Sequence, residues 1–323
     1  MKILANDGIA ASGKEALEAA GFTVVTENVP QDQLEAAINN ERYVALLVRS
    51  ATKVRQPLID ACPGLKLIGR GGVGMDNIDV DYARSKGLEV INTPAASSQS
   101  VAELVFAHLF GMVRFVYDSN RQMPTRGASE FKVLKKAYAK GAELRGKTLA
   151  VLGFGRIGQF TGRYALGCGM KVLYYDPFLP EVTLDLHIEG HGTVEVKLTS
   201  SSMDDALAQA DFISLHMPAQ ADGSAVLGTA EFNKMKDGVC IVNAARGGVI
   251  DEDALMAALD SGKVAHAACD VFVNEPTPRE DVLAHSKISL TPHIGAATNE
   301  AQSRIGTELA DKIKAYFAKE PVG

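Results

Sequence analysis

The chain has 323 residues, which suits two domains rather than one, because single hydrophobic cores stop growing at roughly 250 residues. A hydrophobic fraction of 46% and a charged fraction of 22% are ordinary for a folded protein and exclude a disordered chain. The formal net charge of −6 is spread without acidic or basic blocks, so we expect no nucleic acid and no membrane among the partners.

The cysteines and the N-terminus indicate a cytoplasmic protein. The four cysteines are far apart, each in or beside an apolar segment, which suits free thiols in a reducing compartment: Cys62, Cys168, Cys240 and Cys269. No C-x-x-C pair occurs, so neither a zinc knuckle nor a redox pair is predicted. Charged residues interrupt the N-terminus before a signal sequence could form, and no run of about 18 apolar residues follows.

Short apolar runs alternate with helical stretches over the first 93 residues. We expect strands at 3–5, 22–25, 44–48, 65–68 and 88–91, and helices at 12–20, 32–38 and 80–86. This βα repeat predicts a parallel sheet and a domain of its own.

Two arginines stand at the ends of neighbouring strands of this domain. Arg49 and Arg70 follow the third and fourth apolar runs, and open parallel sheets bind ligands beyond the carboxyl ends of their strands. Backbone N–H groups of the glycine-rich loop 71–74, which includes Val73 and Gly74, can also form an anion-binding concavity. The alternative is that the arginines are surface charges and the glycines only a flexible turn.

A long helix is predicted after the small, polar segment 92–98, where the chain leaves the first domain. Ser100 and Glu103 have the spacing of a capping box, and apolar residues recur at helical spacing from Val101 to Val116. This face could pack in an interdomain core or against a second subunit, and the sequence does not separate these alternatives. We expect a homodimer through this helix region. His108 lies on or near the face, and we interpret it as a core histidine with its hydrogen bonds satisfied.

A dinucleotide-binding turn is predicted where the apolar run 149–152 meets Gly153, Gly155 and Gly158, followed by a helix over 157–166. The first glycine permits the tight turn, the second lets backbone approach a pyrophosphate, and the third lets the helix pack on the sheet. The anion would lie at the helix N-terminus, which the helix dipole favours.

The next apolar run, 171–175, ends in Asp176, about 20 residues after the glycines. A carboxylate there accepts hydrogen bonds from ribose hydroxyls and repels a 2′-phosphate, so we expect NAD rather than NADP. The alternative is a glycine-rich turn in another doubly wound protein, in which Asp176 only starts a turn.

Residues 178–202 carry the weakest pattern, with one strand predicted at 194–198. His187 and His191 could suggest a metal site, but no clear further ligand accompanies them. We expect a solvated loop there, and no metal.

The doubly wound pattern resumes with strands at 212–216, 239–242, 265–271 and 288–290, and helices at 251–259 and 301–317. The last helix is expected to return and pack on the first domain. Polar groups at successive strand ends suit catalysis: Arg246 can bind a carboxylate with two donors, His293 can transfer a proton, and Glu275 can orient its imidazole. Taken individually, Arg246 could form a surface ion pair, His293 could be a residue near a helix cap, and Glu275 could be a turn residue.

Several stretches resemble the D-isomer-specific 2-hydroxyacid dehydrogenase family over nearly the full length. They are 48–52, 69–79, 92–103, 152–158, 243–253, 270–276 and 292–295. The resemblance implies an NAD-dependent oxidoreductase with Arg246 on the substrate carboxylate, His293 as acid and base, and Glu275 as its partner. The implied cofactor contacts are Val73, Gly153, Gly155, Arg156, Ile157, Gly158, Asp176, Met217, Ala244, Ala245, Asp270 and Gly295, and the implied substrate contacts are Arg49, Arg70, Val73 and Gly74.

The resemblance also implies an α/β fold with two doubly wound parallel-sheet domains. A Rossmann NAD-binding domain is expected over 97–293, and a flavodoxin-like substrate-binding domain over 1–96 and 294–323. Two additional cations suit a phosphorylated substrate, so the expected reaction is oxidation of 3-phosphoglycerate in serine biosynthesis. A glyoxylate or hydroxypyruvate reductase is the alternative, followed by a non-catalytic NAD-sensing binding protein.

The sequence departs from the family at a few positions. Ser97 stands where the family often has asparagine, Val73 and Met217 stand where threonine is common, and residues 181–200 look longer than usual. The chain ends at Gly323, so the C-terminal regulatory domain of longer relatives, and feedback inhibition through it, are not expected.

Overall fold

In a computed structural model, which describes residues 1–319, the chain forms two compact units. Unit 1 consists of Met1–Ser100 and the segment from Ala296 onward, and unit 2 of Val101–Gly295. The divisions fall at Ser100 and Gly295, a few residues later than the expected boundaries at 96 and 293. The last four residues of the expected segment 294–323 lie outside the described residues.

Unit 1 contains a five-stranded parallel sheet in the order β2-β1-β3-β4-β5, which is the flavodoxin-like order. Its strands are β1 (Lys2–Ala5), β2 (Thr23–Val25), β3 (Tyr43–Val48), β4 (Leu67–Arg70) and β5 (Glu89–Asn92). Successive residues of a strand face opposite sides, so Leu46 joins one core layer while Ala45 and Leu47 join the other. Both faces are therefore apolar and must be covered.

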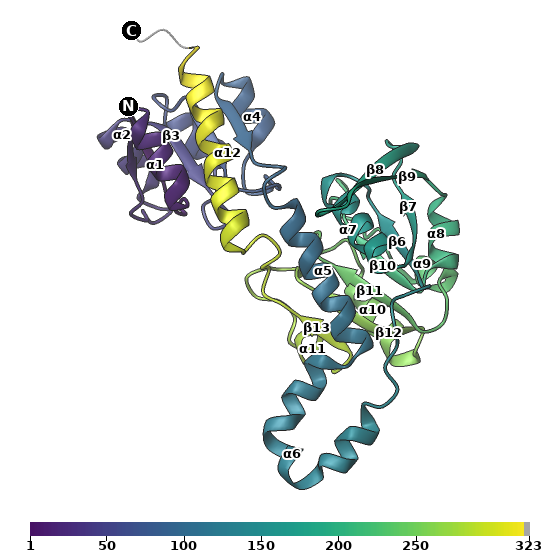
Figure 1. The fold of residues 1–323 in the computed structure, drawn as a ribbon. Coiled ribbons are helices and arrows are strands. Elements are labelled where there is room, and N and C mark those ends of the chain that lie inside the picture. Colours follow the sequence, from purple (N-terminus) through teal and green to yellow (C-terminus); the bar gives the residue numbers. More distant parts are fainter. Residues whose placement is uncertain (320–323) are drawn as a thin grey trace. The chain divides into compact units, whose positions relative to one another are not determined.

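Helices cover the two faces of this sheet. They are α1 (Ala11–Ala19), α2 (Leu34–Glu41), α3 (Gln56–Ala61), α4 (Val80–Ser85) and α12 (Asn299–Phe317). Leu309, Ile313 and Phe317 of α12 are buried with Leu17 of α1, and Figure 1 shows α12, in yellow, beside α1. The expected return of the last helix to the first domain is confirmed.

Unit 2 contains a six-stranded parallel sheet in the order β13-β12-β11-β10-β6-β7. Its strands are β6 (Thr148–Leu152), β7 (Lys171–Tyr175), β10 (Phe212–Leu215), β11 (Val239–Asn243), β12 (Val264–Cys269) and β13 (Ile288–Leu290). The chain proceeds from β6 to β7 on one side and then continues from β10 on the other. The strand order therefore reverses between β6 and β10, where doubly wound proteins bind ligands.

Helices flank this sheet and close two core layers. They are α5 (Ser98–Val113), α6 (Val116–Ala137), α7 (Arg156–Gly167), α8 (Met203–Gln209), α9 (Thr229–Lys234), α10 (Glu252–Ser261) and α11 (Glu280–Ala284). Ala150 and Leu152 of β6 face one layer, while Leu149 and Val151 face the other. The expected α/β class with two doubly wound sheets is confirmed.

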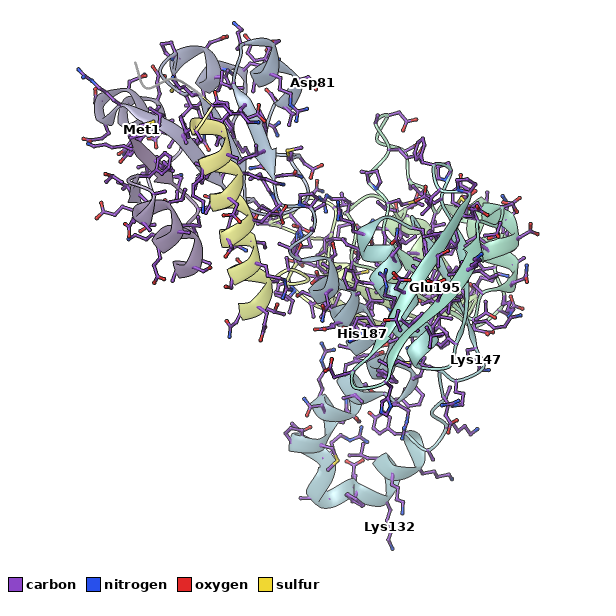
Figure 2. The ribbon with its side chains drawn as sticks, turned by 45° about the horizontal axis from the view of Figure 1, so that its top comes forward. Met1, Asp81, Lys132, Lys147, His187 and Glu195 are labelled. Carbon is purple, nitrogen blue, oxygen red and sulfur yellow. The ribbon has the colours of Figure 1, made fainter. Side chains whose placement is uncertain are left out.

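Residues 178–202 differ from the prediction. The strand predicted at 194–198 is confirmed as part of β9 (Gly192–Thr199), but the expected loop before it contains β8 (Glu181–Ile188), which pairs with β9 in an antiparallel hairpin. Figure 2 labels His187 on β8 and Glu195 on β9. Leu184 is buried beside Gly162 of α7, and Val182, Leu186 and Leu198 pack against the same core cluster, whereas most side chains of β9 are exposed.

Helix α5 differs from the prediction at its start, and α6 was not predicted. The long helix begins at Ser98, so Ser100 and Glu103 lie inside it and do not form the expected capping box. No element was expected between Val116 and the apolar run 149–152, but residues 116–137 form α6, which has non-helical dihedrals at Glu130 and bends in Figure 1. Only Leu134 of α6 is buried, while Met123, Phe131 and Val133 are exposed, so little of this helix packs in the core of unit 2.

Among the described residues, no single helix is long and apolar enough to span a membrane. Helices α5 and α6 pass that test of length and composition only together, as a pair bent by 58°.

Candidate active site

The glycine turn after β6 has the geometry that its three glycines predict. Gly153 has φ of 88°, and a Cβ there would lie 2.7 Å from the carbonyl oxygen of His216. A Cβ at Gly158 would lie 2.2 Å from the carbonyl oxygen of Gly153, so the helix packs directly on the turn. A Cβ at Gly155 would meet no other protein atom within 4 Å. Two glycines are thus required by the fold, whereas the third leaves space beside the backbone.

Asp176 holds this turn from the end of β7. Its Oδ2 accepts the N–H of Phe154 at 2.8 Å, and its Oδ1 accepts the N–H of Phe178 at 2.9 Å. The ring of Phe154 is buried and stacks on Tyr174, with ring centroids 4.1 Å apart. Asp176 is therefore a structural residue of the turn as well as a candidate ligand for ribose.

The helix after the turn presents its N-terminus to the same place. Arg156 and Ile157 are the first two residues of α7, where unpaired N–H groups and the helix dipole favour an anion. Met217 lies next to the turn, because its backbone nitrogen would be 3.0 Å from a Cβ on Gly153. These predicted cofactor contacts therefore surround one turn.

Three further strand ends lie at the same edge of the sheet, because all its strands are parallel. Loop 243–248 follows β11, loop 270–275 follows β12, and loop 291–295 follows β13. A Cβ on Gly247 would be 2.0 Å from the carbonyl oxygen of Phe272, so the first two loops touch through their backbones. The sheet thus gathers the candidate catalytic groups of unit 2.

His293 and Glu275 form a hydrogen-bonded pair. The Nδ1 of His293 lies 2.8 Å from Oε2 of Glu275, and the two side chains are 44% and 36% exposed. The other oxygen, Oε1, accepts the N–H of Phe272 at 3.0 Å, which fixes the carboxylate. Since an ionised carboxylate only accepts, Nδ1 carries a proton and Nε2 is left to exchange one with a ligand.

The backbone around this pair is strained. His293 has φ of 54° and Asn274, next to Glu275, has φ of 61°, both in the left-handed region that side chains rarely adopt. Such strain costs energy and persists where surrounding contacts impose it, as at functional sites.

Arg246 is positioned by Asn243, which the sequence analysis did not select. The buried Asn243 accepts the N–H of Ala245 at 3.1 Å and donates to the carbonyl oxygen of Arg246 at 2.9 Å. One guanidinium nitrogen of Arg246 donates to the carbonyl oxygen of Ala245 at 2.7 Å. A polar residue at the end of an otherwise apolar strand was the available signal. The backbone of Ala244 and Ala245 lies in this same loop.

Asp270 is buried and ties the His293 loop to β12. Its Oδ1 accepts the N–H of Ile294 and its Oδ2 the N–H of Gly295, each at 2.8 Å. The hydroxyl of Thr291 donates to Oδ1 at 2.6 Å. Asp270 and Gly295, both predicted cofactor contacts, are therefore direct partners.

His216 is a second residue that the sequence analysis did not select. Its Nε2 lies 2.8 Å from Oγ of Ser214 and 3.1 Å from Oγ1 of Thr161, which connects β10 to α7. Its Nδ1 is buried without a partner among the described residues. Burial lowers the pKa of His216 to about 3, so the ring is neutral beneath the glycine turn.

In unit 1, Arg49 follows β3 and Arg70 is the last residue of the neighbouring strand β4, since Val48 pairs with Arg70. The loop 71–74 after Arg70 is held by β5: Asn92 donates to the carbonyl oxygen of Val73 at 2.7 Å, and Thr93 donates its N–H to that of Gly72 at 3.0 Å. Val73 and Gly74 are at least partly exposed, as are both arginines. The predicted anion-binding groups of unit 1 thus share one sheet edge.

Unit 2 has the features of a dinucleotide-binding domain. The space beside Gly155, the N-terminus of α7 and the half-buried Asp176 fit the pyrophosphate and ribose of such a cofactor. A strand order that reverses at this turn supports the same class.

Comparisons with known proteins agree with this class. A family model described as "D-isomer specific 2-hydroxyacid dehydrogenase, NAD binding domain" matches residues 106–295. The chain is 44% identical to a hydroxypyruvate reductase of Thermotoga maritima over 93% of this chain and 91% of that protein. It is 38% identical to D-3-phosphoglycerate dehydrogenase 2, chloroplastic, of Arabidopsis thaliana over 97% of this chain and 48% of that protein. The chain thus spans about half the length of that phosphoglycerate dehydrogenase.

Among solved structures, the chain resembles a glyoxylate reductase from Paecilomyes thermophila, with a TM-score of 0.81 and 30% identity over 98% of this chain and 95% of that chain. The chain therefore belongs to the D-isomer-specific 2-hydroxyacid dehydrogenase family. Members of this family are NAD-dependent oxidoreductases that act on the CH–OH group of a D-2-hydroxy acid, and NAD is the cofactor.

Proposed function

We propose that this protein catalyses the reversible oxidation of D-3-phosphoglycerate to 3-phosphohydroxypyruvate, with His293, Glu275 and Arg246 as its catalytic residues. The observation that carries the proposal is the pair of His293 and Glu275, 2.8 Å apart, at the sheet edge that also holds the glycine turn. We assign unit 2 to NAD and unit 1 to the substrate.

Each residue has a separate part in the proposed reaction. NAD, when bound, would supply the acceptor for the hydride that leaves C2 of the hydroxy acid, and NADH would supply the hydride for the reverse direction. Neutral His293 takes the hydroxyl proton at Nε2, while Glu275 keeps the proton on Nδ1 and stabilises the imidazolium that forms. Arg246 binds the substrate carboxylate through its planar guanidinium.

The arginines of unit 1 support a phosphorylated substrate. Arg49 and Arg70 provide two cations, and the backbone of Val73 and Gly74 provides a concave loop, which together suit a phosphate better than an uncharged hydroxymethyl group. We propose a place in serine biosynthesis on this basis.

A second candidate is a hydroxypyruvate or glyoxylate reductase. The observation that favours it is the 44% identity to a hydroxypyruvate reductase over nearly the whole of both chains, against 38% for the Arabidopsis phosphoglycerate dehydrogenase.

A substrate panel separates the two candidates. Initial rates with NADH should be measured on 3-phosphohydroxypyruvate, hydroxypyruvate, glyoxylate and pyruvate. The proposal expects the highest kcat/KM on the phosphorylated acid, and Arg49→Ala or Arg70→Ala should remove that preference. Equal or better values on the uncharged-tail acids in the unmodified protein would refute it in favour of the reductase. Tight NADH binding without turnover on any acid would indicate a binding protein instead.

The role of His293 is tested on the best panel substrate. His293→Ala should lower kcat by about 10²- to 10⁴-fold, the usual contribution of a general acid and base, while NADH binding changes little. The exposed His187, on the β8–β9 hairpin, gives a matched control, and His187→Ala should retain full turnover. Undiminished turnover in His293→Ala would exclude the proton-transfer role.

We also propose a homodimer that uses the outer side of the α5 region. The inner side is already occupied, because Val105, Leu109 and Met112 are buried in the core of unit 2. Phe110 and Val116 remain exposed, and α6 adds the exposed Met123, Phe131 and Val133, which are apolar side chains that a second subunit could cover. Phe110→Glu with Phe131→Glu should yield monomers in sedimentation, whereas Phe178→Glu, at another exposed aromatic, should not.

The unpaired thiols support a reducing compartment, and we propose the cytoplasm. Cys62, Cys240 and Cys269 are buried and free, and burial raises their pKa values, so they are poor nucleophiles.

A further inference from the structure

Helix α5 is connected to the His293 loop by a buried chain of hydrogen bonds. The Nδ1 of His108 lies 3.0 Å from Oγ of Ser289, and its Nε2 lies 3.1 Å from Oγ1 of Thr291. Thr291 then donates to Asp270, which accepts the N–H groups of Ile294 and Gly295 on the far side of His293. The expectation that His108 is a core histidine with satisfied hydrogen bonds is confirmed. Its partner Thr291 also connects it to the loop that carries His293, which a role in the core does not require.

The donor and acceptor in each of these hydrogen bonds follow from Asp270, the acceptor at the end of the series. The carboxylate of Asp270 only accepts, so the single hydroxyl proton of Thr291 is committed to it. Thr291 must then accept from His108, which places the imidazole proton on Nε2. Burial lowers the pKa of His108, although the charge of Asp270 opposes the shift, so the ring is neutral and Nδ1 accepts from Ser289. One arrangement of protons satisfies all four groups.

His108 begins two sets of hydrogen bonds, called here the Thr291 arm and the Ser289 arm, and they reach different parts of unit 2. The Thr291 arm leads to Asp270 and through it to the backbone N–H groups that follow the strained His293. Thr291 also lies before His293 in the same loop, and its carbonyl oxygen accepts the N–H of His293 at 3.0 Å. The Ser289 arm ends within β13. The strained conformation of His293 needs surrounding contacts to impose it, and the Thr291 arm supplies them.

We propose that His108 and Thr291 are positioning residues, which hold Asp270 and the 291–295 loop so that His293 meets Glu275 and the substrate in the productive geometry. This rests on the proposed catalytic role of His293. Neither residue touches the reacting atoms, and both act through Asp270.

The two hydroxyls beside His108 give a matched pair of variants. Thr291→Val keeps the shape of the side chain but breaks the arm to Asp270, and it should lower kcat at least tenfold while the KM for the 2-oxo acid changes less than threefold. Thr291→Ser restores the hydroxyl and should bring kcat back to within threefold of the unmodified protein. Ser289→Ala, which removes the other hydroxyl on the same ring, should also stay within threefold. Rates are measured with NADH on hydroxypyruvate and 3-phosphohydroxypyruvate.

His108 itself is tested by a double-mutant cycle. His108→Leu should reduce kcat as much as Thr291→Val, and the double variant should be no worse than either single one, because both break the same chain. His108→Gln retains an N–H donor and should recover part of the loss.

A second measurement needs neither NADH nor turnover. Amide hydrogen exchange of Ile294 and Gly295 in the protein without cofactor should accelerate at least tenfold in Thr291→Val and stay unchanged in Ser289→Ala. If His108 has a purely structural role, Thr291→Val and Ser289→Ala should have equal effects on amide hydrogen exchange and on kcat. That result would overturn the proposal. His293→Ala serves as the reference: if it retains full turnover, the proposed function has failed, whereas a dead His293→Ala beside a fully active Thr291→Val rejects only the positioning role.

Discussion

Substitution of two glycines of the turn after β6 should separate the needs of the fold from those of the cofactor. At Gly158, an added Cβ lies 2.2 Å from the carbonyl oxygen of Gly153, which is backbone and cannot rotate away. The start of α7 must move, so Gly158→Ala should cost about 1–3 kcal/mol of stability, as overpacking does. That corresponds to a fall in Tm of about 2–4 °C per kcal/mol in a domain of this size.

Gly155 is the matched control, because its added Cβ meets no other protein atom within 4 Å and its φ of −66° suits alanine. Alanine is a poorer N-cap than glycine but restricts the unfolded chain, so the free energy of unfolding should change by less than about 1 kcal/mol. A methyl group beside the pyrophosphate should nevertheless raise the Kd for NADH at least tenfold, which is about 1.4 kcal/mol.

Calorimetry and NADH fluorescence titration measure the two effects. The reasoning is refuted if Gly155→Ala binds NADH as well as the unmodified protein, since the cofactor then does not approach the turn there. Equal melting temperatures for Gly155→Ala and Gly158→Ala would refute the packing argument.

Three further predictions concern single side chains. Asp176→Asn removes the charge that would repel a 2′-phosphate, so the ratio of kcat/KM with NADPH to kcat/KM with NADH should rise by roughly tenfold. The Tm should also fall, because both carboxylate oxygens accept backbone N–H groups. An unchanged ratio would contradict the assignment of Asp176 to the ribose. Glu275→Gln keeps an acceptor for Nδ1 of His293 but loses the charge, so kcat should fall on the order of tenfold, less than in His293→Ala; the reverse ranking would argue against Glu275 as the partner of the proton-transferring group. His216 titrates at about pH 3 when folded and about 6.5 when unfolded, so it binds a proton only in the unfolded chain between these values. The free energy of unfolding should therefore fall by on the order of 2–3 kcal/mol between pH 7 and pH 4.5 through this residue, a loss that denaturant titrations of His216→Gln should lack.

The sequence was most informative where local chemistry and pattern coincide. Glycines 153, 155 and 158 between two apolar runs predicted the turn, because each position imposes a steric demand that few other residues meet. Short continuous apolar runs likewise identified the strands of both sheets, because parallel strands that are covered on both faces are apolar along their whole length. Arg246, Glu275 and His293 could be selected because they follow such runs.

Pattern reasoning was less successful where segments have little buried surface. The strand predicted at 194–198 lies within β9, whereas α6 and β8, in which only Leu134 and Leu184 are buried, were not predicted. The short helices α3, α8, α9 and α11 were not predicted either, because five to seven residues provide fewer than two turns of periodicity.

By itself, the sequence determined the fold class, the dinucleotide turn and the residue types that could transfer a proton or bind a carboxylate, because these follow from local sterics and side-chain chemistry. The sequence also predicted Glu275 as the partner of His293. Only the tertiary structure decided the contacts of Asn243 with the Arg246 loop and the hydrogen-bond chain from His108 to Asp270, because these join residues whose meeting depends on sheet order and helix packing. Strand order is set by long-range burial, which no short stretch of sequence encodes.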